Sequence, residues 1–149
     1  MHYLDRDDAE MYLRQAKRIA VLGIKPKSRQ ERAAHYIPAY LASVGYEIIP
    51  VPTRYHEETE ILGYKVIRSL LDVPKPVDIV NIFLKPEDVP TYTDDLITLA
   101  PRVVWFQSGL LNEGCANKMM ESGILIAHYC IGCMRAELPP PCKPLPGQG

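Results

Sequence analysis

Four cations follow a single glycine near the start of the chain. Gly23 ends an apolar run, and Glu31 is the only acid among the cations after it. These cations are Lys25, Lys27, Arg29 and Arg32. Clustered cations at the start of a helix suit phosphate groups, because the helix N–H groups add directed donors to the positive charge. A solvated basic loop has the same composition, so the position of the cluster in the fold must distinguish the two interpretations.

The usual nucleotide fingerprints do not fit this loop. G-x-G-x-x-G would need glycines at positions 25 and 28, where Lys25 and Ser28 stand. A nicotinamide ribose would also need an acid at the end of the second strand, which reads Pro-Val-Pro-Thr over residues 50–53. No P-loop, catalytic triad or carboxylate pair is evident either. We expect a phosphate-rich ligand, poor binding of NAD and nucleoside triphosphates, and no catalytic residue.

Cys130 and Cys133 form a C-x-x-C motif, which is typical of a redox pair or of half a zinc site. A zinc site would need two more ligands, for which His128, Cys115 and Cys142 are the candidates. A thioredoxin-like pair would follow the first strand at a helix start, whereas this motif follows the last predicted strand. We therefore expect reduced, metal-free thiols that finish a buried strand.

Composition favours a small cytoplasmic protein. The chain has 149 residues, 47% hydrophobic and 23% charged, as in a single globular domain. A net charge of −1 argues against binding to nucleic acid or to an acidic membrane. No apolar run approaches the length of a membrane span, and the polar first residues do not read as a secretory signal.

Apolar runs alternate with amphipathic segments along the chain. The expected strands are residues 18–23, 46–51, 77–83, 103–106 and 124–127. The expected helices are residues 5–17, 33–45, 86–99 and 112–122. Pro38 predicts a kink or a late start in the second helix, Pro90 predicts a late start in the third, and His35 is expected to pack within its helix. This alternation predicts an α/β fold: a Rossmann-like, doubly wound, parallel five-stranded sheet with helices on both faces, in three layers.

Domain boundaries follow from the same pattern. Residues 1–137 are expected to form one domain. Residues 138–149 contain five prolines and two glycines and are expected to form a disordered or extended tail. In such a sheet the ligand lies beyond the carboxyl ends of the strands, which places the site in the loops 23–29, 50–53, 83–86 and 107–110.

Several stretches, in order and at this spacing, resemble one known family. They are residues 19–23, 40–41, 45–52, 60–63, 77–83 and 104–107 with Gly109. The chain is similar over about residues 19–137 to small stand-alone CoA-binding proteins of bacteria and archaea. These are relatives of the CoA-binding domain of succinyl-CoA synthetase α subunits.

The resemblance implies that coenzyme A (CoA) or an acyl-CoA is the bound ligand. Its diphosphate and adenosine would lie at the first loop and at the ends of the second and third strands, with Trp105, Gln107 and Gly109 at the rim. Trp105 between two apolar neighbours is most simply read as a core residue. Together with the basic loop, the expected contacts are Gly23, Ile24, Lys25, Pro26, Lys27, Arg29, Arg32, Pro50, Val51, Pro52, Thr53, Phe83, Leu84, Lys85, Pro86, Gln107 and Gly109.

Three functions stay open at this point. The first is non-catalytic binding of CoA or an acyl-CoA, with a homodimer or a partner enzyme left open. The second is an enzyme, either a CoA-linked transferase or an NAD(P)-dependent oxidoreductase. The third is an interaction protein that has lost its ligand, because Lys25 stands where many members of the family carry serine. Ligation by the mechanism of the ligase relatives is not expected, since their phosphorylated histidine lies in a second domain.

Overall fold

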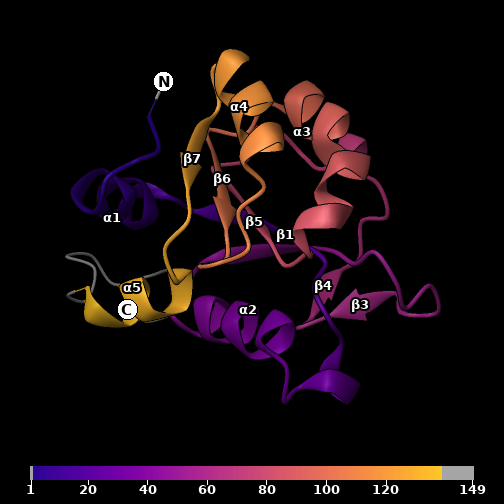
Figure 1. Cartoon of the computed structure of the whole chain (residues 1–149). Helices are drawn as coiled ribbons and strands as arrows, with labels where there is room; N and C mark the ends of the chain where they lie inside the picture. The colour runs from indigo at the N-terminus through magenta and orange to yellow at the C-terminus, as the bar shows by residue number, and fades with distance from the viewer. Residues whose placement is uncertain (1, 139–149) are drawn as a thin grey trace.

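A five-stranded parallel sheet forms the centre of the protein (Figure 1). The structure, a computed structural model, describes residues 2–138, so the expected tail falls outside the described residues except for Leu138. The strands are β1 (Arg18–Leu22), β2 (Glu47–Val51), β5 (Ile79–Ile82), β6 (Val103–Phe106) and β7 (Leu125–Ala127), in the spatial order β2-β1-β5-β6-β7. All four neighbouring pairs are parallel.

Helices cover both faces of this sheet, because strands that are apolar at every position need a partner layer on each side. One apolar cluster packs beneath α1 (Arg6–Gln15), α2 (Ala33–Ser43) and α5 (Ile131–Glu137). The other packs beneath α3 (Thr93–Leu99) and α4 (Glu113–Glu121), with the 3-10 helices η2 (Leu70–Asp72) and η3 (Pro86–Tyr92). The predicted three-layer α/β fold is confirmed.

Strand register brings three loops together at one edge. Leu22 pairs with Val51 on one side and with Ile82 on the other, so β2, β1 and β5 end side by side. The chain leaves this edge through the 3-10 helix η1 (Lys27–Arg29) after β1 and through a short hairpin, β3 (Glu60–Ile61) and β4 (Tyr64–Lys65), after β2. Residues far apart in sequence therefore meet beyond these strand ends.

The two prolines inside predicted helices differ in their effect on where the helix begins. Pro90 lies in η3, and the α-helix begins only at Thr93, as expected. Pro38 instead lies inside α2, which begins at Ala33, so the alternative of a late start is wrong. The helix α5 was not predicted, because the C-x-x-C motif was read as the end of a strand. Within residues 2–138, no helix combines the length and the apolar composition that crossing a membrane requires.

Candidate ligand-binding site

The main cavity, of about 430 Å³, opens beyond the ends of β2, β1 and β5. Its lining residues are Gly23, Ile24, Lys25, Arg32, Ala33, Ala34, Thr53, Arg54, Tyr55, Phe83, Leu84, Lys85, Asp88 and Leu110. A second cavity of about 420 Å³ shares Thr53 with it and extends over Val51, Pro52 and Arg68. Together they have the size of a site for a large small-molecule ligand.

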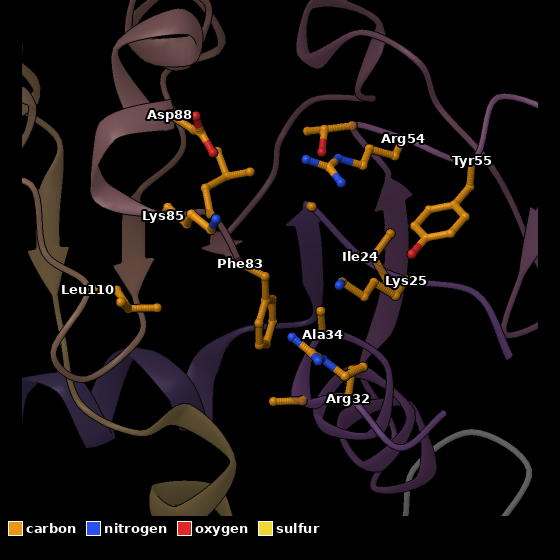
Figure 2. A pocket seen from close by; sticks show the side chains of 14 residues that line it. Ile24, Lys25, Arg32, Ala34, Arg54, Tyr55, Phe83, Lys85, Asp88 and Leu110 are labelled. Carbon is orange, nitrogen blue, oxygen red and sulfur yellow. The ribbon is translucent and has the colours of Figure 1, made fainter. Parts of the chain in front are cut away.

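Four cations line the main cavity, and each of three loops supplies at least one. Lys25 and Arg32 come from the segment after β1, Arg54 from the loop after β2, and Lys85 from the loop after β5. Figure 2 shows their nitrogen-bearing ends turned toward the space beside Phe83. Asp88 is the one carboxylate in the lining, and within residues 2–138 no ion pair joins these cations to an acid. The cavity is therefore suited to a ligand with several negative charges.

Gly23 permits the close approach that forms the cavity floor. Its φ is +88°, and a Cβ atom there would lie 2.5 Å from the carbonyl oxygen of Phe83. The Gly23 N–H donates to the carbonyl of Val51, and the Phe83 N–H donates to the carbonyl of Leu22. The hydrogen bonds of the sheet therefore continue one residue beyond the ends of β1 and β5. A side chain at position 23 would push the two loops that follow these strands apart.

The first loop is held by the start of α2. Proline has no N–H, so Pro38 leaves the carbonyl of Ala34 without its usual partner in the helix. The N–H of Lys25 donates to that carbonyl at 3.0 Å. Nδ1 of His35 lies 2.8 Å from the carbonyl oxygen of Lys25 and must carry the proton, because the carbonyl can only accept. The buried His35 packs as expected, and its role is to position Lys25 rather than to meet the ligand.

The loop after β2 is held by Arg68. The Arg68 guanidinium donates to the carbonyls of Tyr55, His56 and Glu58. Tyr55 itself has a left-handed φ of 60°, which turns the chain directly after Arg54. This anchoring fixes the backbone directly after Arg54, the cation that the loop contributes to the cavity.

Eight of the predicted contact residues line the main cavity: Gly23, Ile24, Lys25, Arg32, Thr53, Phe83, Leu84 and Lys85. Val51 and Pro52 line the second cavity, again with Thr53. Neither cavity includes Pro26, Lys27, Arg29, Pro50, Pro86, Gln107 or Gly109. Lys27 and Arg29 lie exposed on η1, and Pro50 is buried within β2. Trp105 belongs to the core and not to the rim, since it is fully buried and its indole N–H donates to the carbonyl of Tyr129.

Sequence reasoning missed six residues of the main cavity: Ala33, Ala34, Arg54, Tyr55, Asp88 and Leu110. Arg54 and Tyr55 directly follow Thr53, so extending the predicted loop by two residues would have included them. Ala33 and Ala34 form the first turn of α2, which parallel-sheet topology places at the site. Leu110 ends the predicted loop 107–110 but was not among the expected contacts, and Asp88 carries no comparable signal in the sequence.

A buried amide pair lies behind the cavity. Asn81 in β5 is fully buried, and its Oδ1 accepts a hydrogen bond of 3.2 Å from Nε2 of Gln107. The Nδ2 group of Asn81 has no hydrogen-bond partner among the described residues. A buried amide donor without a partner is costly, and neither cavity reaches this one.

The cysteines differ from the expectation. The structure joins Cys130 and Cys133 by a disulfide, so the prediction of reduced thiols is wrong here. The physical reason is the unpredicted helix: Cys130 caps α5, and the first helical turn brings the two Cα atoms to 5.3 Å, within reach of a disulfide. The described residues contain no cluster of three metal-ligating side chains. That the thiols are metal-free stays a prediction.

Comparisons with known proteins give one family and several similar proteins. A family profile described as "CoA binding domain" matches residues 17–136. The uncharacterized protein YneT of Bacillus subtilis is 37% identical over 121 residues, which cover 80% of this chain and 85% of YneT. The solved structure of cell-free ID.343 from Thermus thermophilus is 34% identical, with a TM-score of 0.82 over 89% of this chain and 98% of that one. A hypothetical protein from Pyrococcus horikoshii is 32% identical, with a TM-score of 0.79 over 91% and 92% of the two chains.

Proposed function

The chain belongs to the CoA-binding domain family, and from this premise we propose that it binds CoA or an acyl-CoA in the main cavity. The observation that carries the proposal is the convergence of Lys25, Arg54 and Lys85 on one cavity from three different loops. CoA carries a diphosphate and a separate 3′-phosphate, so its charge is divided between two places. Cations from separate loops can meet both groups, which a single basic loop would do poorly.

The cations divide between the phosphate groups by position. Lys25 lies next to the Gly23 turn and is half-buried, which suits it to the diphosphate. Arg32 is exposed at the start of α2, and its planar guanidinium suits a terminal phosphate such as the 3′-phosphate. The second cavity beyond Thr53 offers apolar walls and could take the flat base of the ligand.

The proposed role is binding without catalysis. Asp88 is the one carboxylate of the main cavity, and no histidine lines it, so its lining offers neither a carboxylate pair nor a histidine–carboxylate pair. An NAD-type ligand would need an acid after β2, where Thr53 and Arg54 stand. In this proposal the protein acts in the cytoplasm. A partner enzyme or a second copy of the chain would use the bound ligand.

Thermal unfolding with a panel of ligands tests this function. A ligand that binds only the folded state at 100 times its Kd adds about 2.7 kcal/mol of stability. CoA should therefore raise the Tm by several degrees, while NAD and NADP should raise it little. No shift with CoA, or equal shifts with all three ligands, would contradict the proposal.

A further inference from the structure

The disulfide lies at the same edge of the sheet as the main cavity. All five strands are parallel, so their carboxyl ends share one edge, and Cys130 lies three residues after the end of β7 at that edge. In Figure 1, α5 lies beside α2, the helix whose first turn lines the cavity. The two features therefore belong to one side of the molecule.

α2 connects them over a short distance. Ala33 lines the main cavity, and Ile37, four residues later, lies on the same face of the helix. Gly132 stands between the two cysteines, and a Cβ atom there would lie 3.4 Å from Cγ2 of Ile37. One turn of helix rises about 5.4 Å, so α2 meets Gly132 about one turn along its axis from the residue that lines the cavity.

The contacts around the disulfide fix the residue before it. The Trp105 indole holds the carbonyl of Tyr129, which precedes Cys130, at 2.8 Å. Asn81, two residues before the cavity residue Phe83, is fully buried and is not offered to a ligand. The pantetheine arm of CoA ends in a thiol, which is the group that exchanges with a disulfide.

The two sulfurs are not equivalent. Cys133 is exposed, whereas Cys130 is half-buried and its Sγ accepts the Cys133 backbone N–H at 3.3 Å. A thiolate attacks the accessible sulfur and expels the sulfur whose thiolate is better stabilised. Attack at Cys133, with Cys130 as the leaving group, follows from both properties.

We propose that the Cys130–Cys133 disulfide exchanges with the thiol of the bound ligand through a mixed disulfide between CoA and Cys133, which Cys130 can resolve. This inference rests on the proposed function, which supplies the thiol. The CoA sulfur, as thiolate, forms a bond to Sγ of Cys133 while the Cys130–Cys133 bond breaks, and the electron pair of that bond leaves on Cys130. The CoA sulfur and Cys133 end oxidised as a disulfide and Cys130 ends reduced, so the step needs no further oxidant.

The test compares thiols by intact mass under acid quench and without oxygen. The disulfide form of the full chain is mixed with CoA or, at equal concentration, with glutathione, which lacks the groups that the cavity would hold. The CoA adduct should form at least about ten-fold faster, because binding in the cavity raises the effective concentration of the thiol. Peptide mapping should place the adduct on Cys133. Equal rates for the two thiols, or an adduct at another cysteine, would overturn the inference.

Two cysteine variants and one ligand analogue complete the design. Oxidised CoA disulfide should give a lasting adduct with Cys130→Ser, because this variant lacks the resolving thiol. The control Cys115→Ala, which replaces a buried cysteine and keeps Cys130, should give only a transient adduct. The binding of desulfo-CoA, which has no thiol, is measured by calorimetry on the same protein. Binding of desulfo-CoA without any CoA adduct would sink the exchange and leave the proposed function standing. Failure of desulfo-CoA to bind would overturn the proposed function itself.

Discussion

Arg29 and Arg32 differ in their surroundings although three positions separate them. Arg32 lines the main cavity, whereas Arg29 lies exposed on η1 outside it. Arg32→Gln should weaken CoA binding by about three- to ten-fold, because a charge-assisted contact of an exposed side chain contributes about 1 kcal/mol. The same substitution should leave 3′-dephospho-CoA binding nearly unchanged. Arg29→Gln is the matched control and should affect neither ligand.

Calorimetric titration of both variants with both ligands checks this assignment. Equal losses for CoA and dephospho-CoA in Arg32→Gln would show that this arginine does not serve the 3′-phosphate. A larger loss in Arg29→Gln than in Arg32→Gln would place the 3′-phosphate over η1 instead.

The residue types in the sequence indicated that the site is cationic. They did not show which of the cations line the cavity. Lys25, Arg32 and Lys85 were predicted from charge and position, and the structure places all three at the cavity. Lys27 and Arg29 have the same charge, but the turn of η1 carries them to the surface. That Nδ2 of Asn81 has no partner within residues 2–138 could not be predicted, since this depends on side-chain geometry across two strands.

At the scale of elements, the turn at Gly23 is the most constrained feature of the site. Gly23→Ala meets both a left-handed φ and a backbone oxygen at 2.5 Å. The φ costs about 1–2 kcal/mol, and the overlap adds about 1–3 kcal/mol by forcing the ends of β1 and β5 apart. Gly63→Ala has a φ of +82° and nothing within 4 Å, so it isolates the first cost.

Urea unfolding of the two variants measures the difference. Gly23→Ala should lose more of the free energy of unfolding than Gly63→Ala and should also lose CoA affinity, whereas Gly63→Ala should keep that affinity. Identical losses of stability in the two variants would show that the strand ends can separate without cost.

Tyr46 joins three elements through one side chain. Its hydroxyl donates to the carbonyl of Leu13 at 2.6 Å, and the guanidinium of Arg135 lies over its ring. Burial raises the pKa of Tyr46 above its usual 10.0, with the Arg135 charge opposing the shift. The unfolded chain then ionises first, so the stability from this group is present below about pH 10 and falls as the pH rises through the folded pKa.

Tyr46→Phe should therefore cost about 1 kcal/mol near neutral pH, from the lost hydrogen bond. It should also flatten the loss of stability above about pH 10. Urea midpoints of both proteins at about pH 8 and about pH 10.5 give the comparison, with Tyr36→Phe, an exposed tyrosine on α2, as the control. A parallel decline of Tyr46→Phe and the parent protein would rule out the buried hydroxyl as the source.

Element boundaries show where local sequence signals fail. Pro38 suggested a late helix start, but the carbonyl of Ala34 that it leaves free accepts from the N–H of Lys25, nine residues earlier in the chain. The helix α5 has seven residues and begins inside the C-x-x-C motif, so no amphipathic repeat was long enough to reveal it. Tertiary contacts decide both cases.

For the whole molecule, the fold was predictable because each parallel strand must be buried on both faces and each crossover covered. The five apolar runs in the sequence correspond to the five strands of the sheet. The cavity was predictable in place but not in shape, since its walls come from loops whose backbones are set by contacts such as those of Arg68.

Calorimetric titration of the chain with CoA, on the parent protein and on Lys25→Gln/Lys85→Gln, tests the central claim most directly. The double variant removes cations from two separate loops of the main cavity, and Lys118→Gln removes an exposed cation on α4 as the control. The account predicts one CoA per parent chain, affinity about ten-fold weaker or more in the double variant, and unchanged affinity in the control. Absence of CoA binding to the parent protein, or unchanged affinity in the double variant, would contradict it.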